Sequence, residues 1–399
     1  MMASQPRLRI LSLSTVFPNP SEPGLGPFIR ARLSALGAHA EVCVIAPIAP
    51  FDYDNPKRRG LGRRSVPFRR QDGPLEVYSP AWCYLPGGRF VNGILLAMQV
   101  VSLVRRLDGR NRFDVLDAHF AHPEGVAAGL LAAVLRRPFV VTLRGSEPRH
   151  SGYPLRRRLM AWALKRASAV FAVSSQLGQL AAELGARPHT IRMVGNGVAP
   201  EFSEAARRFR PAGHGNPYTI LSIGRLSENK GHQHVIRVVA QLRRSGIPVR
   251  LRIIGEAGRG IRSHGPELEK LIAQLDVSQH VEMAGWMPQS ALAEAMAQAD
   301  VMCLASHREG WPNVVHEALA CGTPVVAFDV GSVATLIPDE RYGFVVPRED
   351  CAALQQALER ALNKSWDRSA IAAWGGSRTW ETVAQELLPV LRGVAGTKH

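Results

Sequence analysis

Residues 309–326 read E-G-W-P-N-V-V-H-E-A-L-A-C-G-T-P-V-V, and the fold prediction starts from this stretch. Pro312 suits the first turn of a helix, because proline lacks the N–H that such a turn leaves unused. Apolar strands are predicted on both sides of this helix, at residues 301–304 and 324–328. The order strand, turn, helix, strand is typical of a parallel sheet with crossover helices.

The same alternation extends along the chain in both directions. In the first half, strands are expected at residues 8–16, 41–46, 115–119, 139–143, 169–173 and 189–194. In the second half they are expected at residues 218–223, 249–254, 281–283, 301–304, 324–328 and 343–346. A Gly/Pro-rich interruption at residues 207–217 separates the two blocks.

The sequence therefore predicts an α/β protein of two Rossmann-like domains, at residues 1–208 and 209–378. A helical pattern at residues 379–394 has no strand after it, so we expect it to pack back onto the first domain.

Composition excludes several other classes of protein. The five cysteines form no C-x-x-C pair, which argues against a disulfide framework and a zinc site and fits a reducing cytoplasm. The longest apolar stretch, residues 90–104, is interrupted by Asn92 and Gln99 and is shorter than the roughly 20 residues that span a bilayer. We expect a cytoplasmic protein without a transmembrane helix.

The net charge of +16 lies entirely in the first half of the chain. Residues 1–210 hold 30 Lys and Arg against 14 Asp and Glu, whereas residues 211–399 hold 19 of each. This asymmetry suggests a negatively charged partner such as nucleic acid, anionic lipid or a phosphorylated acceptor, with a merely soluble basic surface as the alternative. Residues 51–86 show no regular period and contain K-R-R-G-L-G-R-R, so we expect an extended insertion whose basic part, residues 57–70, docks on an anionic membrane face.

Polar residues follow the predicted strands of the second block, where open parallel sheets bind ligands. Asn313, Val314 and Val315 would offer backbone N–H groups at the start of the helix, which is an anion site. Glu309 precedes this helix and Glu317 lies one turn inside it, on the face of Asn313. Two carboxylates beside an anion site suit a hydroxyl-rich ligand.

A second motif, G-R-L-S-E-N-K-G at residues 224–231, fills the turn after another strand. Arg225 can fork onto two phosphate oxygens while Lys230 acts as a point charge, so together they could neutralise a leaving diphosphate without metal. A solvated basic pair is the alternative. Asp52 and Asp54 form a D-x-D, a metal-site pattern that three residues match often by chance.

Together these motifs resemble the family 4 retaining glycosyltransferases of the GT-B fold, in which two Rossmann-like domains face each other across a cleft. The Glu-x7-Glu pair of Glu309 and Glu317 and the G-R-L-S-E-N-K-G motif carry this resemblance. It extends to F-P-N-P at residues 17–20, V-T-L-R-G-S-E at 141–147 and V-G-N-G-V at 194–198, and so covers nearly the whole chain.

The resemblance implies a role for each donor-side residue. Arg225 and Lys230 would hold the diphosphate, and the amides of residues 313–314 would complete its cradle. Glu317 would bond the ribose hydroxyls, and Glu309 would hold hydroxyls of the donor sugar. The donor would be a nucleotide-diphosphate sugar, used without metal and without any other cofactor.

The resemblance also places residues of the first domain. His119 matches a catalytic position near the reacting carbon, and Gly24 and Gly26 match a glycine loop that approaches the donor phosphates. Arg144 and Glu147 would lie on the acceptor side, and they depart from the H-G-S-D that is common in the family.

The implied activity is a metal-independent, retaining transfer of hexosyltransferase type to a glycan or lipid-diphosphate-linked acceptor, in polysaccharide biosynthesis. An enzyme with a lipid-linked acceptor would be peripheral on the inner face of the plasma membrane. The alternatives are a nucleotide-sugar epimerase of the same fold, a sugar-binding module without activity, and a basic nucleic-acid-binding protein. No helix-turn-helix, finger or aromatic stacking motif supports nucleic acid as a partner.

Overall fold

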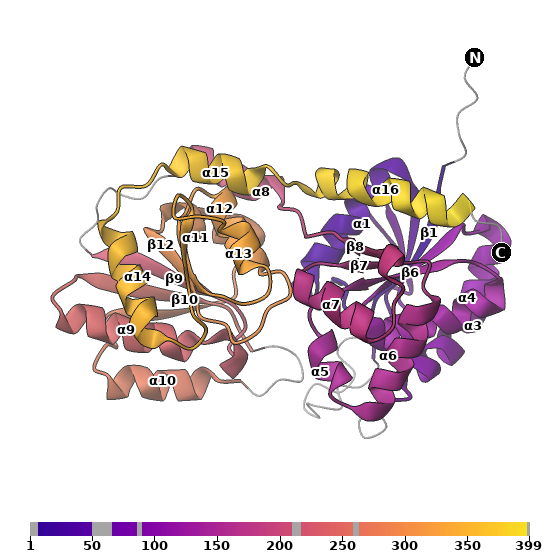
Figure 1. Cartoon of the computed structure of the whole chain (residues 1–399), viewed down its shortest axis with the longest axis horizontal. Coiled ribbons are helices and arrows are strands. Elements are labelled where there is room, and N and C mark those ends of the chain that lie inside the picture. The colour runs from indigo at the N-terminus through magenta and orange to yellow at the C-terminus, as the bar shows by residue number, and fades with distance from the viewer. Residues whose placement is uncertain (1–6, 50–65, 86–89, 210–216, 258–262, 397–399) are drawn as a thin grey trace, which may run out of the picture. The chain divides into compact units, whose positions relative to one another are not determined.

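The computed structural model describes residues 7–49, 66–85, 90–209, 217–257 and 263–396. The chain divides into two compact units (Figure 1). The first comprises Met1–Gly197 and Trp380–His399, and the second comprises Val198–Thr379. The sequence placed this boundary at residues 208/209, but α8 (Pro200–Arg208) buries Phe202 in the core of the second unit and therefore belongs to it.

The first unit is built on an eight-stranded sheet in the order β3-β4-β2-β1-β5-β6-β7-β8, parallel except for β3. Its strands are β1 (Arg9–Leu13), β2 (Glu41–Ile45), β3 (Arg69–Asp72), β4 (Leu75–Tyr78), β5 (Val115–His119), β6 (Phe139–Leu143), β7 (Ala169–Ala172) and β8 (Ile191–Met193). The first strand is shorter than expected, because regular pairing ends at Leu13 and the following residues form a loop.

The helices of the first unit are α1 (Pro27–His39), α3 (Asn92–Asn111), the short η2 (Ala121–Gly125), α4 (Val126–Leu135), α5 (Glu147–Ser151), α6 (Pro154–Arg166), α7 (Ser175–Glu183), η3 (Pro188–Thr190) and α16 (Trp380–Gly396). The last of these comes from the far end of the chain and lies beside α1 (Figure 1). Val383, Leu387 and Leu391 of α16 are buried in the core of this unit. His39 of α1 and Glu381 of α16 also approach within 2.7 Å.

The described part of the insertion is more regular than its sequence suggested. Residues 69–78 form a hairpin in which β3 pairs with β4, and β4 adds to the sheet next to β2. Tyr78 is buried, and its hydroxyl donates a hydrogen bond to the Glu76 carboxylate. The expectation of a segment without regular structure was wrong for these residues, because a short hairpin buries too few apolar positions to show a clear period.

The second unit is built on a six-stranded parallel sheet in the order β11-β10-β9-β12-β13-β14. Its strands are β9 (Tyr218–Ile223), β10 (Val249–Ile254), β11 (Val281–Gly285), β12 (Val301–Leu304), β13 (Val325–Phe328) and β14 (Gly343–Val346). Its helices are α8, η4 (Glu228–Lys230), α9 (His232–Arg244), α10 (Gly265–Gln274), α11 (Gln289–Gln298), α12 (Asn313–Ala320), α13 (Val333–Leu336), α14 (Cys351–Asn363) and α15 (Arg368–Gly376).

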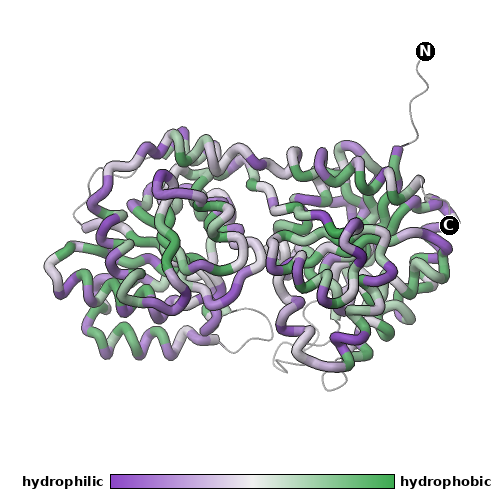
Figure 2. Tube along the Cα trace, viewed as in Figure 1, coloured by the Kyte–Doolittle hydropathy of each residue, from purple (hydrophilic) through white to green (hydrophobic). Residues whose placement is uncertain are grey.

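The inner strands of both sheets are largely apolar and are covered by helices, as Figure 2 shows by hydropathy, whereas the edge strand β3 is polar. Central strands such as β7, β12 and β13 are buried along their whole length, as parallel strands with helices on both faces must be. No helix in the described part of the chain is long and apolar enough to cross a membrane.

Strand order also shows where a ligand can bind. In the first sheet the order reverses between β1 and β5, and in the second it reverses between β9 and β12. Loops that leave neighbouring strands at such a point diverge and open a crevice at the carboxyl edge of the sheet. The loops after β1, β5, β9 and β12 are therefore expected to form the ligand-binding sites.

Candidate functional site

The loops after β9 and β12 meet at the switch point of the second sheet. Gly231 ends the first of these loops with φ 68°, and a Cβ there would lie only 1.8 Å from the carbonyl oxygen of Ala305. Only glycine permits this approach. Two hydrogen bonds then join the loops. The His307 amide donates to the Asn229 carbonyl at 2.8 Å, and the Asn229 side chain donates to the Arg308 carbonyl at 3.1 Å.

This close approach brings together two residues that lie far apart in the sequence. Lys230 Nζ donates to Glu309 Oε1 at 2.6 Å, with side chains that are 17% and 11% exposed. From behind, Gly331 supports the Glu309 loop at φ 59°, where a Cβ would lie 2.6 Å from the Glu309 carbonyl oxygen. The sequence predicted both charged groups as site residues, but gave no sign that they pair with each other.

Arg225 lies in the same turn as Lys230, but in a different environment. Its side chain is exposed, and no carboxylate in the described residues forms an ion pair with it. Beneath the turn, the buried His232 bonds the Ser222 hydroxyl at 2.7 Å and lies 3.3 Å from the Gly224 carbonyl. Burial lowers the pKa of His232 to about 4, so the ring is neutral. The sequence analysis did not predict His232 as part of the site, although it directly follows the K-G of the motif.

The helix α12 presents its N-terminus at this site. The first intrahelical bonds come from the amides of Val315 and His316 to the Pro312 carbonyl, so the amides of Asn313 and Val314 precede them. The expectation that the Val315 amide would be free was wrong, since that amide already donates to Pro312. The dipole at this helix N-terminus favours an anion.

Glu317 lies one turn inside α12 and is only partly buried. Burial raises the pKa of its carboxyl to about 7. Such a group can donate as well as accept hydrogen bonds near neutral pH, which suits a ligand with hydroxyl groups.

In the first unit, the glycine loop follows β1. Gly26 begins α1 with φ 68°, and a Cβ there would lie 2.7 Å from the Val16 carbonyl oxygen, while Gly24 is exposed. The loop is tied to the region after β5 by Glu124, whose carboxylate accepts from the amide and the hydroxyl of Thr15. The two loops of the switch point are thus bonded to each other.

His119 ends β5 and is fully buried. Its Nδ1 accepts from the Arg144 guanidinium at 2.9 and 3.1 Å, and its Nε2 lies 3.2 Å from Asp117 Oδ2. Because a guanidinium can only donate, the proton must sit on Nε2. Burial lowers the pKa of His119 to about 4, against the opposing effect of Asp117.

The role of His119 at the reacting carbon stays a proposal, and its surroundings favour a positioning role over direct contact. Both ring nitrogens face protein groups and the ring has no exposed surface. Asp117 is shared with Arg32, whose Nη2 lies 3.5 Å from Oδ1. Burial raises the pKa of Asp117, but Arg32 and His119 outweigh this effect and hold that pKa well below its usual range.

Arg144, expected on the acceptor side, is the outermost member of this chain of contacts. Its side chain donates to His119 and, at 3.0 Å, to Asn196 Oδ1, and its guanidinium lies 5.2 Å from the Phe28 ring beside the glycine loop. Burial, and then the charge of Arg32, lower the pKa of Arg144, although a guanidinium stays protonated at neutral pH. The residue is 9% exposed.

Glu147 was also expected on the acceptor side, but it points inward and is buried. Its carboxylate accepts from the amides of Gly145 and Arg144 at 2.7 and 3.2 Å and from the amide of Ala121 at 3.3 Å. Burial raises the pKa of Glu147, and these bonds oppose the rise. In this structure the side chain shapes the loop after β6 and is 1% exposed, and its place on the acceptor side stays a proposal.

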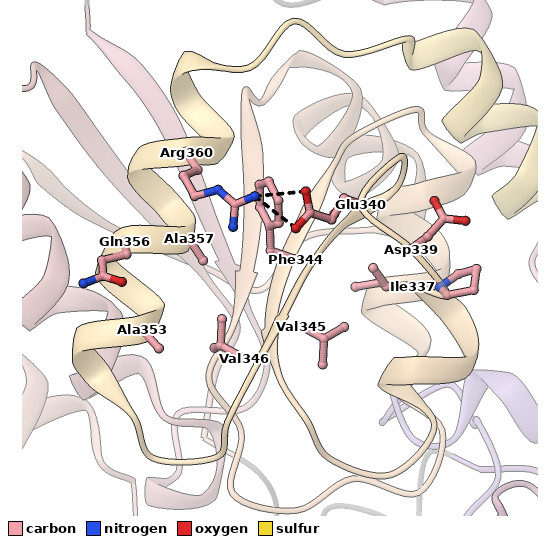
Figure 3. Close-up of a pocket in the computed structure, with 12 residues that line it drawn as sticks. Ile337, Asp339, Glu340, Phe344, Val345, Val346, Ala353, Gln356, Ala357 and Arg360 are labelled. Carbon is pink, nitrogen blue, oxygen red and sulfur yellow. Dashed lines mark hydrogen bonds and ion pairs between the residues drawn. The ribbon is translucent and has the colours of Figure 1, made fainter.

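A pocket of about 330 Å³ lies elsewhere in the second unit, between β14 and α14 (Figure 3). Arg360 and Glu340 form an exposed ion pair across it, at 2.9 and 3.0 Å. None of the predicted site residues lines it.

In the ranges that the structure describes, no group of three or more His, Cys, Asp or Glu is arranged to hold a metal ion. The D-x-D of Asp52 and Asp54 lies outside those ranges.

Comparison with known proteins identifies the family. The family profile "Glycosyltransferase Family 4" matches residues 29–202, and "Glycosyl transferases group 1" matches residues 204–374. TuaC of Bacillus subtilis, assigned to teichuronic acid biosynthesis, is 26% identical over 385 residues, which is 88% of this chain and 89% of that protein. A D-inositol 3-phosphate glycosyltransferase of Kineococcus radiotolerans is 32% identical over 234 residues, 52% of this chain and 53% of its own length.

Solved structures agree on the architecture. Anabaena HepE in complex with UDP has a TM-score of 0.67 at 21% identity, covering 97% of this chain and 100% of HepE. Sucrose-phosphate synthase of Thermosynechococcus elongatus has a TM-score of 0.74 at 18% identity, covering 97% of this chain and 99% of that chain. Both likenesses show the GT-B fold. The chain therefore belongs to the family 4 (group 1) glycosyltransferases, and it is a retaining enzyme that depends on a nucleotide sugar.

Proposed function

We propose that the second unit binds the donor through the cluster at the β9/β12 switch point. Arg225, Lys230 and the first amides of α12 hold the diphosphate. Glu317 bonds the ribose hydroxyls, and Glu309 bonds hydroxyls of the sugar. The observation that carries this proposal is the contact of Lys230 with Glu309, which joins the phosphate side of the site to the sugar side at 2.6 Å.

The same arrangement supports transfer without a metal ion. When the bond between the anomeric carbon and the phosphate oxygen breaks, negative charge develops on the diphosphate. Fixed cations and amide dipoles that already point at this charge stabilise it as it forms. Two side-chain cations and a helix N-terminus supply the electrostatic role that a divalent ion has in other transferases.

For the acceptor, we propose a glycan or lipid-diphosphate-linked sugar of a cell-surface polysaccharide. TuaC supports this assignment over most of the chain, and the positive surplus of the first half fits an anionic acceptor. No nucleic-acid partner is proposed, because the group 1 and family 4 profiles together span both halves of the chain.

We also propose that the basic part of the insertion, residues 57–70, docks on an anionic membrane surface. Residues 57–65 of this basic part lie outside the described residues. Arg69 pairs with Glu76, and Arg70 bonds Ser79 and Pro18, so these two are used within the hairpin. Liposome binding that rises with anionic lipid and falls with salt tests the proposal, and equal binding to neutral and anionic liposomes contradicts it.

A thermal-shift panel tests the donor proposal. Uridine, guanosine and adenosine diphosphate sugars are compared, because a ligand that binds only the folded state raises apparent stability. We expect one base class to stabilise the wild type, and Arg225→Gln combined with Lys230→Gln to abolish that shift. A shift that survives in the double variant, or no shift with any of the three, would overturn the assignment.

A further inference from the structure

Two buried guanidinium groups, those of Arg32 and Arg144, lie near the carboxyl edge of the first sheet, and among the described residues only Arg32 forms an ion pair. Arg32 donates to the Thr142 hydroxyl at 2.6 Å and lies 3.5 Å from the Asp117 carboxylate. Asp117 also faces His119 at 3.2 Å. The negative charge of Asp117 is therefore already used by the deeper arginine and the ring beside it.

Arg144 has a different set of partners. Its side-chain donors reach His119 Nδ1 and Asn196 Oδ1, which are both uncharged. Within the described ranges no carboxylate forms an ion pair with it, and the nearby Glu147 carboxylate is bound to backbone amides. A guanidinium that is nine-tenths buried beside neutral acceptors is costly, because buried charges are normally paired or bound to a ligand.

The orientation of this guanidinium is nonetheless fixed. His119 accepts from both Nε and Nη2, Asn196 accepts from Nη1, and the ring of Phe28 in the first turn of α1 lies 5.2 Å from the guanidinium carbon. Three of its five N–H groups are satisfied in this way, and no residue that the structure describes accepts from the other two. Arg144 directly follows β6, the strand next to β5 at the switch point, and so lies at the carboxyl edge where open sheets bind ligands.

We propose that Arg144 is the counter-ion for an oxyanion, a phosphate or a carboxylate, of the acceptor, and that Asp117 and His119 are the positioning residues that hold it ready. This inference rests on the proposed function in taking the first unit as the acceptor side. It deepens that function by naming the acceptor class, which carries a negative group close to the hydroxyl that receives the sugar.

The first test uses inorganic phosphate as the probe and needs no knowledge of the acceptor. The background is Arg225→Gln combined with Lys230→Gln, so that the donor cradle does not bind phosphate. Thermal unfolding is followed as phosphate replaces chloride at constant ionic strength. We expect a saturable rise of the midpoint temperature in this background and its loss when Arg144→Gln is added.

Two further variants keep the test decisive. Arg149→Gln removes an exposed cation five residues along the chain and should leave the phosphate effect unchanged. Arg144→Lys keeps the charge but cannot reach both neutral acceptors, so phosphate affinity should fall roughly tenfold. Equal phosphate affinity in Arg144→Lys and Arg149→Gln, or no saturable effect in the background, would overturn the proposal, whether or not Arg144→Gln folds.

A second arm separates the acceptor from the donor as the source of the anion. Titration of wild type and Arg144→Lys with UDP, GDP and ADP should give the same affinity for whichever diphosphate binds. A weakening of tenfold or more would assign the guanidinium to the donor diphosphate and overturn the acceptor assignment. Failure of all three diphosphates to bind the wild type would count against the proposed donor site alone, since the phosphate result does not depend on it.

Discussion

Replacing Lys230 and Arg225 separately should give two different results, although both residues belong to the same motif. Lys230 Nζ lies 2.6 Å from Glu309 Oε1, and both side chains are largely buried, whereas Arg225 is exposed. Lys230→Ala leaves a largely buried carboxylate without its cation. Arg225→Ala removes a charge that the folded protein does not use.

The magnitudes follow from this geometry. Two unit charges about 3 Å apart attract by roughly 5 kcal/mol at an effective dielectric constant near 20. Desolvation cancels much of that attraction, and the partial exposure of the pair reduces it further, so we expect Lys230→Ala to cost about 2 kcal/mol of unfolding free energy. Arg225→Ala should change it by less than about 0.5 kcal/mol. Turnover should fall roughly 100- to 1000-fold in both variants, because each removes a cation from the departing diphosphate.

The assay combines release of nucleoside diphosphate from the donor with thermal unfolding of each variant. Arg244→Ala, an exposed arginine in the last turn of α9, is the matched control and should change neither quantity. Wild-type turnover in either site variant would refute the role in catalysis. Equal destabilisation by Lys230→Ala and Arg225→Ala would refute the structural reasoning and leave the catalytic role standing.

Three further results are expected. Activity in a rate assay should survive EDTA, because protein cations and amides stabilise the charge of the diphosphate. Complete loss of activity that a divalent metal restores would disprove this. Gly231→Ala should destabilise the second unit and abolish donor binding by calorimetry, since a Cβ would lie 1.8 Å from the Ala305 carbonyl oxygen; normal binding would contradict the loop geometry. His232 and His316 have pKa values lowered to about 4 by burial, so the unfolding free energy should fall as pH drops from 6.5 towards 4, by about 1 kcal/mol per histidine at pH 5.5. His316→Gln should weaken this dependence of the unfolding free energy on pH. The same pH dependence in His316→Gln and wild type, measured by denaturant titration at each pH, would argue against the role of His316.

The second sheet was predicted almost strand for strand, and the reason is its hydropathy. Its strands β9, β12 and β13 are short, largely apolar runs, because both of their faces are buried. The hairpin at residues 69–78 was missed, since its two four-residue strands read R-R-Q-D and L-E-V-Y. The domain boundary was placed too late for a related reason: α8 is an ordinary amphipathic helix, and only packing shows which core takes Phe202.

The sequence alone determined the fold class, the family resemblance and the position of the candidate donor residues, because strand periodicity and the turns that follow each strand are local properties of the chain. Tertiary structure decided which of those residues meet. Lys230 and Glu309 are 79 positions apart, and Arg144 and Asn196 are 52 apart, so their contacts depend on strand order and on loops that only glycine allows to touch. It also decided that His119 and Glu147 face inward, because burial and the competition for hydrogen-bond partners are set by all the surrounding elements together.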